Sequence, residues 1–326
     1  MLPMATGTPA SIAICFVLAS PREETRSAYW QRRVRAWMQE VPLLRDRVTP
    51  HWSPRRRLGY GAGLRACVNS LRRRHTTLPP IIVLRPDGDE PTLADVDEVR
   101  RFDPAAYASI RPTNTYWGCE AYYKLQIFAL HGYDRVVYLD CDTVALDDVS
   151  ALWDPQRFAD RDLYGVRETT EMGSKAPMVG KVNSGVLVVN GPLLSPVVHE
   201  RMIDIARTGL SYDGGDQGVL HRYLDEHPHV RVGELDAAYN VMVAWKTHGR
   251  WERIADRVRI LHFVNAFKPW TAHHARDPLF DAEFKRLWDD AFRSTLAPIA
   301  GRPAGAEAKA GRHPAGRQAS EHLPRR

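Results

Sequence analysis

The stretch YDRVVYLDCDTVALDDVSALWD, residues 133–154, joins a short apolar segment to two aspartates. Residues 135–139 carry mainly β-branched and aromatic side chains, which predicts a buried strand. Asp140 and Asp142 follow directly. Neighbouring side chains point to opposite faces of a strand, but where the strand ends the backbone turns and two carboxylates can converge. Because adjacent anions repel each other, this pattern predicts a cation between them, and a divalent metal ion is the usual one.

Composition indicates an ordinary globular chain rather than a nucleic-acid-binding one. The 326 residues are 44% hydrophobic and 26% charged, which is enough to bury the core of one large α/β domain or two small ones. The net charge is +6, but residues 301–326 contain six Lys or Arg and two Glu, so this segment alone supplies +4. It is rich in Ala, Gly, Pro and Arg without periodicity, which predicts a disordered basic tail.

Cysteine usage and the first apolar run favour a reducing compartment. The four cysteines form no CxxC motif, and each lies in or beside an apolar segment, which indicates small buried thiols. The apolar run over residues 11–20 has no Lys or Arg before it and is too short to span a bilayer. It therefore predicts a first strand, and we expect a cytoplasmic protein without a transmembrane segment.

Strands and helices are expected to alternate along the chain. Apolar and β-branched runs predict strands over residues 11–20, 81–84, 135–139, 183–190 and 258–270. Apolar spacing and end signals predict helices over residues 21–44, 64–75, 118–134, 195–207 and, after a turn, 212–227, with a loop over 49–63. This alternation predicts an α/β domain with a mostly parallel sheet, whose ligands bind beyond the carboxyl ends of the strands. The polar residues expected at strand exits or helix starts, and therefore in one site, are Asp140, Asp142, Asn183, Asp216, His262 and Lys268.

Several segments, in matching order and spacing, resemble the glycogenin-like retaining glycosyltransferases of family 8. They are YYKLQIFALHGYDRVVYLDCDTVALDDVSALWD (122–154), VNSGVLVVN (182–190), YDGGDQGVL (212–220), LHFVNAFKPW (261–270) and, less closely, residues 59–84. The resemblance covers roughly residues 60–290 and the first strand. It implies a GT-A type nucleotide-binding fold, with a twisted, mostly parallel central sheet flanked by helices. It also implies a Mn²⁺-dependent transfer of a sugar from a UDP-sugar.

The resemblance implies that Asp140 and Asp142 are the metal ligands of a DxD motif and that His262 is the third ligand. An imidazole nitrogen beside carboxylates favours Mn²⁺, with Mg²⁺ as the alternative. A divalent ion would neutralise the charge that builds on the departing diphosphate. From the residues alone, the aspartates could instead cap a loop turn, and His262 could be a hydrogen-bonded core histidine.

Further donor contacts are also implied by the resemblance. Lys268 and Lys124 match lysines near the donor, although a surface lysine and a solvated helix face remain the alternatives. Tyr60 matches an aromatic residue that stacks on uracil, a contact worth ~1–3 kcal/mol. The remaining donor positions are Leu18, Ala19, Ser20, Cys141, Asn183, Ser184 and Asp213.

This chain departs from the family between the first strand and Tyr60, where it inserts about forty residues, 20–59. That insertion either caps the pocket or recruits an acceptor. We expect residues 1–300 to form the glycosyltransferase domain, followed by the tail over 301–326.

The turn DGGDQG, residues 213–218, supplies the expected catalytic residues beside Lys124. The resemblance places Asp216 and Gln217 next to the anomeric carbon. Retention of configuration requires either a double displacement with Asp216 as nucleophile, or front-face attack in which the leaving phosphate takes the acceptor's proton and Gln217 steadies the cation. Both routes stay open, as does a simple helix-capping role for Asp216.

The expected product is a hexose (glucose, galactose or N-acetylglucosamine) linked to a hydroxyl of an acceptor of unknown class. One family member glucosylates its own tyrosine in the segment that matches residues 241–260, and this chain has no Tyr there. Self-glucosylation is therefore not expected. A homodimer is compatible with the sequence, which leaves the oligomeric state open. Trp245 and Trp251 in that segment either stack on an acceptor or pack internally.

Two other functions are compatible with paired aspartates. A nucleotidyltransferase that forms nucleotide-sugars would start with a Gly-rich phosphate loop, and GYGAG (59–63) is not one. A non-catalytic nucleotide-sugar binding module would not need the complete set of expected ligands.

Overall fold

The computed structural model describes residues 11–18, 60–87, 96–111, 119–170, 176–247, 251–264, 268–270 and 281–294. The chain divides into two units, Met1–Leu296 and Ala297–Arg326, and all described residues lie in the first. The helix expected over 21–44, the insertion 20–59 and the basic tail lie outside the described residues. No helix among the described segments is long and apolar enough to cross a membrane.

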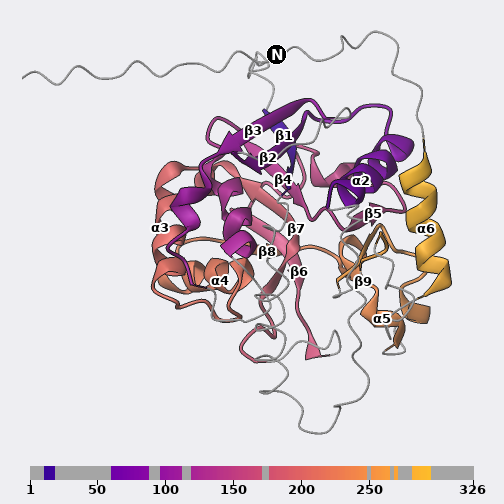
Figure 1. Cartoon of the computed structure of the whole chain (residues 1–326). Coiled ribbons are helices and arrows are strands. Elements are labelled where there is room, and N and C mark those ends of the chain that lie inside the picture. The colour runs from indigo at the N-terminus through magenta and orange to yellow at the C-terminus, as the bar shows by residue number, and fades with distance from the viewer. Residues whose placement is uncertain are drawn as a thin grey trace, which may run out of the picture. The chain divides into compact units, whose positions relative to one another are not determined.

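A seven-stranded sheet organises the first unit (Figure 1). Its spatial order is β3 (Glu98–Phe102), β2 (Ile81–Pro86), β1 (Ile12–Val17), β4 (Arg135–Leu139), β7 (Val182–Asn190), β6 (Leu163–Arg167) and β8 (Val232–Glu234). Neighbouring strands are parallel except where β7 pairs with β4 and β6. The predicted α/β architecture is confirmed, and the sheet is mixed because β7 alone runs in the opposite direction.

The reversed direction of β7 corrects the expected position of its polar residues. Asn183, which was expected at a strand exit or helix start, lies inside the strand near its amino end, next to Ser184. Antiparallel pairing sets Val186 opposite Leu139, and the Asp140 N–H donates to the Gly185 carbonyl at 2.8 Å. The amino end of β7 therefore lies beside the carboxyl end of β4, at the same edge of the sheet.

A second, three-stranded sheet brings a distant segment to this edge. It has the order β5 (Thr143–Ala145), β10 (Ile260–His262) and β9 (Val241–Met242). β10 pairs antiparallel with β5, so that His262 lies opposite Thr143. Since Thr143 directly follows Asp142, this register places the imidazole beside the aspartates.

Helices cover both faces of the large sheet (Figure 1), with α3 and α4 on one side and α2 with α6 on the other. The α-helices are α2 (Tyr60–Arg74), α3 (Pro196–Arg207), α4 (Asp216–Glu226), α5 (Ala244–Thr247) and α6 (Ala282–Arg293). The 3₁₀ helices are η1 (Pro104–Tyr107), η2 (Cys119–Ala129), η3 (Ser150–Leu152), η5 (Gly191–Leu193), η6 (Ala237–Tyr239) and η7 (Trp251–Arg253).

Alternation along the strands divides the core into two clusters. In β1, Ile14 and Phe16 join the cluster beneath α2 and α6, whereas Ala13 and Cys15 join the one beneath α3 and α4. This is the two-residue period of a strand that is buried on both faces. Fully burying an aliphatic or Phe side chain contributes roughly 1.5–3 kcal/mol, so both faces hold the site's strands in place.

Three helix predictions are confirmed, those for α2, α3 and α4, and the first of them needs a new boundary. The Ser195 hydroxyl caps α3 by accepting the Val198 N–H, and Pro196 occupies the first turn. The helix expected from residue 64 begins at Tyr60, so the loop assigned to 49–63 was wrong for its last four residues. A Cβ at Gly63 would lie 2.5 Å from the Cys141 carbonyl oxygen, so glycine there lets α2 approach the aspartate turn.

The α-helix expected over residues 118–134 is instead the 3₁₀ helix η2. The buried residues Tyr122, Leu125 and Phe128 are spaced by three. That spacing matches the three residues per turn of a 3₁₀ helix, which aligns them in one row against the core.

His221 on α4 should make the stability of the fold depend on pH. Its side chain is buried, its Nε2–H donates to the Val182 carbonyl at 2.8 Å, and burial lowers its pKa from 6.5 to about 4. Between these values the unfolded chain binds a proton that the folded chain does not, so stability falls as the pH falls from 6.5 towards 4. One such group contributes a slope of about 1.4 kcal/mol per pH unit. His221→Gln should reduce the slope of the unfolding free energy, measured by urea denaturation, by about that amount; parallel slopes would contradict the assignment.

Candidate metal centre

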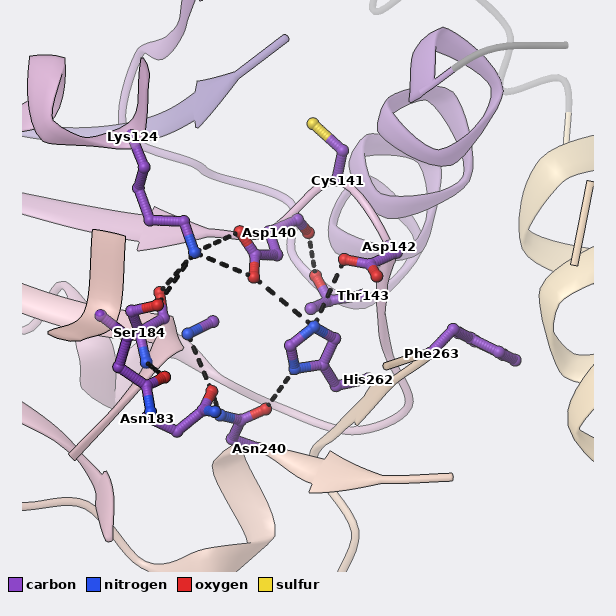
Figure 2. A network of polar contacts seen from close by, with 12 residues as sticks. Lys124, Asp140, Cys141, Asp142, Thr143, Asn183, Ser184, Asn240, His262 and Phe263 are labelled. Atoms are coloured by element: carbon purple, nitrogen blue, oxygen red, sulfur yellow. Dashed lines mark hydrogen bonds and ion pairs between the residues drawn. The ribbon is translucent and has the colours of Figure 1, made fainter. Parts of the chain in front are cut away.

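Asp140, Asp142 and His262 converge at the carboxyl end of β4 (Figure 2). One ligand atom from each lies within 4.8 Å of the others. His262 Nε2 is 3.5 Å from Asp140 Oδ2 and 3.3 Å from Asp142 Oδ1. The prediction that these three side chains meet in space is therefore confirmed by the geometry.

The donor set fits a divalent transition metal. Two carboxylates and one imidazole combine hard oxygen ligands with a borderline nitrogen, which suits Mn²⁺ better than Mg²⁺. The other ring nitrogen, His262 Nδ1, lies 2.8 Å from Asn240 Oδ1. In the neutral ring a proton on Nδ1 leaves the Nε2 lone pair directed at the aspartates.

Two lysines flank the aspartates. Lys124 of η2 places Nζ 3.0 Å from Asp140 Oδ1 and 3.2 Å from Asp216 Oδ2. Lys268 places Nζ 2.6 Å from Asp142 Oδ2 and 2.9 Å from the Phe263 carbonyl oxygen. Their side chains are only 15% and 14% exposed, so neither is a solvated surface lysine.

Burial and these ion pairs set the charges of the cluster. Burial raises the pKa of Asp140, and Lys124 opposes that effect only partly. Burial by itself would raise the pKa of Asp142 as well. Lys268 and His262 outweigh burial and hold the pKa of Asp142 well below its usual range. Burial acts to lower the pKa of Lys124, but Asp140 and Asp216 raise it above its ordinary value. Asp142 is therefore the firmly ionised carboxylate of the pair, and Lys124 keeps its positive charge.

The expected catalytic residues lie in the same cluster. Asp216 Oδ2 accepts the Ser184 hydroxyl at 2.8 Å and pairs with Lys124, which also holds Asp140. Gln217 Oε1 accepts the Ser184 N–H at 2.8 Å. The N-cap of α4 is Gly215, without a side-chain cap, so Asp216 is not the N-cap residue.

Asp213 stabilises the turn before α4 by accepting hydrogen bonds. Its Oδ1 accepts the N–H groups of Gly215 and Gly218 at 2.8 and 2.9 Å and the Ser211 hydroxyl at 3.1 Å. Gly214 between them has φ +78°, a left-handed conformation that glycine adopts without strain. These bonds hold the first turn of α4, and a contact of Asp213 with a sugar remains a prediction.

Other predicted donor residues lie around the aspartate turn. Tyr60 opens α2 and packs edge-on against Trp270, with ring centroids 5.5 Å apart. Leu18 is buried at the end of β1. The Cys141 side chain points away from the two carboxylates (Figure 2), and its thiol donates to the Val17 carbonyl, so only its backbone can face a ligand. The predicted Ala19 and Ser20 lie outside the described residues.

Trp245 and Trp251, for which acceptor stacking and internal packing were the alternatives, pack internally. Trp245 is 5% exposed and belongs to the core cluster beneath α2 and α6. Trp251 packs edge-on against Phe284 of α6, with ring centroids 4.6 Å apart. Internal packing is therefore the alternative that the structure supports for both.

Three residues of the site were missed from the sequence. The Tyr138 hydroxyl donates to Asp140 Oδ1 at 2.5 Å. Glu168 accepts from Asn183 and Gln217, and Asn240 contacts His262. Glu168 directly follows β6, so the strand-exit rule that selected Asp140 could have found it. Asn240 and Tyr138 carry no comparable signal, because a buried polar contact depends on the partner that folding supplies.

The fold is similar to that of solved glycosyltransferases. The galactosyltransferase LgtC, solved with donor and acceptor sugar analogs, has a TM-score of 0.55 and 16% identity, covering 88% of this chain and 98% of that chain. The glycosyltransferase GlyE of Streptococcus pneumoniae TIGR4 has a TM-score of 0.53 and 16% identity, covering 87% of this chain and 61% of that chain. These likenesses show a GT-A glycosyltransferase fold.

Sequence comparison narrows the class to a family. The model of glycosyl transferase family 8 matches residues 91–274, more than half of the chain, and the chain belongs to this family. Inositol phosphorylceramide glucuronosyltransferase 1 of Arabidopsis thaliana is 28% identical over 181 residues, 49% of this chain and 30% of that protein. Glycogenin-1 of Mus musculus is 25% identical over 199 residues, 54% of this chain and 53% of that protein. The chain thus spans about a third to a half of the length of these curated relatives.

Proposed function

We propose that the chain is a metal-dependent, retaining hexosyltransferase that moves a hexose from a UDP-sugar to an acceptor hydroxyl. One observation carries the proposal: a cluster fit for a divalent cation is joined by a single ammonium, Lys124, to the carboxylate of Asp216. The leaving diphosphate needs a cation, the reacting sugar needs a carboxylate, and the two groups must lie side by side. Membership of glycosyl transferase family 8, and a relative named as a glucuronosyltransferase, support the same function.

On the phosphate side, Asp140, Asp142 and His262 would hold the cation, which would neutralise charge on the diphosphate. Lys268 forms an ion pair with Asp142, and its flexible side chain can direct the ammonium group towards a phosphate oxygen. Tyr60, at the start of α2, is the proposed platform for the uracil base.

On the sugar side, Lys124 and the Ser184 hydroxyl orient the carboxylate of Asp216. In a double displacement, a carboxylate oxygen of Asp216 forms a bond to the anomeric carbon as the bond to the diphosphate breaks. The acceptor oxygen then forms its bond to the anomeric carbon as the bond to Asp216 breaks, and its proton passes to a phosphate oxygen of the bound UDP. In front-face attack the acceptor proton passes to the departing phosphate, and Gln217, held by Ser184 and Glu168, steadies the sugar cation.

The proposed acceptor is a separate molecule rather than a tyrosine of the chain itself. Residues 241–260 contain no Tyr. The name of one relative points to a sphingolipid acceptor, and LgtC was solved with an acceptor sugar analog, so the acceptor class is left open.

The proposal is tested by incubating the full chain with UDP-glucose, UDP-galactose or UDP-N-acetylglucosamine and measuring UDP release. We expect slow release from one donor that requires Mn²⁺ and stops on addition of EDTA. Pyrophosphate formed from UTP and a sugar 1-phosphate would instead identify a nucleotidyltransferase. Tight donor binding without turnover would identify a binding module, and hexose increments on the intact protein by mass spectrometry would contradict the separate acceptor.

A further inference from the structure

A line of buried polar side chains runs behind His262, on the side away from the aspartates (Figure 2). Glu168 Oε1 accepts from Asn183 Nδ2 at 2.7 Å, and Asn183 Oδ1 accepts from Asn240 Nδ2 at 2.7 Å. Asn240 Oδ1 then lies 2.8 Å from His262 Nδ1. Asn240 is fully buried, at 0% exposure, and the other three are at most 8% exposed. Burying these polar groups is costly unless each donor and acceptor has a hydrogen-bond partner. The direction of donation along the line is therefore well defined.

The direction of this line is set by groups that cannot be reversed. The Gly185 backbone N–H, which can only donate, donates to Asn183 Oδ1 at 2.9 Å. At the other end of the same amide, the Glu168 carboxylate faces Asn183 Nδ2, and an ionised carboxylate can only accept. Both contacts require the oxygen of Asn183 to face Asn240.

The orientation of Asn183 passes to Asn240 and then to the imidazole. Asn240 must turn its NH₂ group to Asn183 Oδ1, so its own oxygen faces His262 Nδ1. A proton on Nδ1 satisfies that oxygen, whereas a bare Nδ1 would set two lone pairs against each other at 2.8 Å. The neutral ring is therefore held with its proton on Nδ1.

Without this constraint the proton would favour the opposite nitrogen. His262 Nε2 faces carboxylate oxygens of Asp142 and Asp140 at 3.3 and 3.5 Å, and both attract an N–H donor. A proton on Nε2 would occupy the lone pair that a metal ion needs.

We propose that Asn240, oriented by Asn183 and Glu168, is a positioning residue that keeps His262 in the Nδ1–H tautomer and so presents a bare Nε2 to a divalent cation. The proposal rests on the proposed function only in that the cluster binds such a cation. It assigns no contact with the sugar or the nucleotide to Asn240.

The decisive measurement is the ¹⁵N spectrum of histidine side chains in the metal-free full chain at pH 8.5, with His262 identified from a His262→Gln spectrum. We expect the wild-type protein to carry the His262 proton on Nδ1. In Asn240→Leu, which keeps the branched shape of the side chain at a larger volume and removes both hydrogen bonds, the proton should move to Nε2. Mn²⁺ affinity, measured by electron paramagnetic resonance, should weaken by about 10–100-fold, as is typical for partners of metal ligands.

A matched control is Asn69→Leu, which removes a buried amide on α2 that donates to the Ala291 carbonyl at 3.1 Å, outside this line. It should leave both the tautomer and the Mn²⁺ affinity at the wild-type values. An Nε2–H signal in the wild-type protein would overturn the proposal without any variant, even if Asn240→Leu fails to fold. Unchanged tautomer and affinity in a folded Asn240→Leu would overturn it as well. If the tautomer is as expected but no UDP-sugar is turned over, the proposed function fails while this inference stands.

Discussion

Asp142→Asn should abolish Mn²⁺-dependent binding of UDP, with a loss of more than about 100-fold in affinity, because a direct ligand should matter more than the partners of ligands. The substitution keeps the volume of the side chain and removes the charge that both Lys268 and a cation require. Asp142 is the suitable target because its pKa is held well below the usual range by Lys268 and His262 against the upward effect of burial. Binding is measured by isothermal titration of UDP with and without Mn²⁺.

Asp147→Asn provides the control for Asp142→Asn. Asp147 lies just beyond β5 in the same segment, its side chain is 61% exposed, and its ion pair with Arg259 is long at 4.0 Å. The control should bind UDP and Mn²⁺ as the wild-type protein does. Thermal unfolding of both variants separates loss of the site from loss of the fold, since removing one partner of a buried ion pair can cost ~3–5 kcal/mol. Near-normal Mn²⁺-dependent UDP binding by a folded Asp142→Asn would remove Asp142 from the metal site.

Gly185→Ala should eliminate metal binding through a single added methyl group. A Cβ at this position would lie 2.3 Å from His262 Cε1 and 2.7 Å from Nδ1. The ring cannot move aside easily, because it is buried and hydrogen-bonded to Asn240. The added carbon must therefore displace either the imidazole or the start of β7. We expect Mn²⁺ affinity to fall as far as in Asp142→Asn, together with about 1–3 kcal/mol of stability lost to overpacking.

Gly191→Ala is the matched control at the other end of β7. A Cβ there would meet its nearest atom, the Asp134 carbonyl oxygen, at 3.6 Å, an ordinary contact distance. It should bind Mn²⁺ normally and unfold at a similar temperature. Equal Mn²⁺ affinity in Gly185→Ala and Gly191→Ala would show that His262 does not occupy the position on which the site depends.

Local features of the fold were predictable from the sequence. The strand at 135–139 matches β4, and the Ser195 cap of α3 lies where its sequence signal places it. Caps and strand alternation involve residues close together in the chain, so their energies are visible in a short window of sequence.

Elements whose geometry depends on partners were harder to predict. The apolar spacing over 118–134 predicts an α-helix, whereas the structure has the 3₁₀ helix η2, because one stripe of side chains fits either period over so short a length. The direction of β7 was also missed, since an apolar run reads the same whichever way it pairs. That direction decides which end of β7 contributes to the site.

The candidate metal centre also combines features that the sequence predicts with features that depend on distant partners. The strand pattern alone predicted that two aspartates end a buried strand. The resemblance to family 8 indicated His262 as the third ligand and Lys124, Lys268 and Asp216 as residues near the donor. Their mutual arrangement depends on the tertiary structure. The pairing of β5 with β10 sets His262 beside Asp142, and antiparallel β7 carries Asn183 and Gly185 to the edge where Asn240 can orient the imidazole. Hydrogen bonds between strands fix the register of segments that are far apart in the chain, and that register determines how the buried amides Asn183 and Asn240 are oriented.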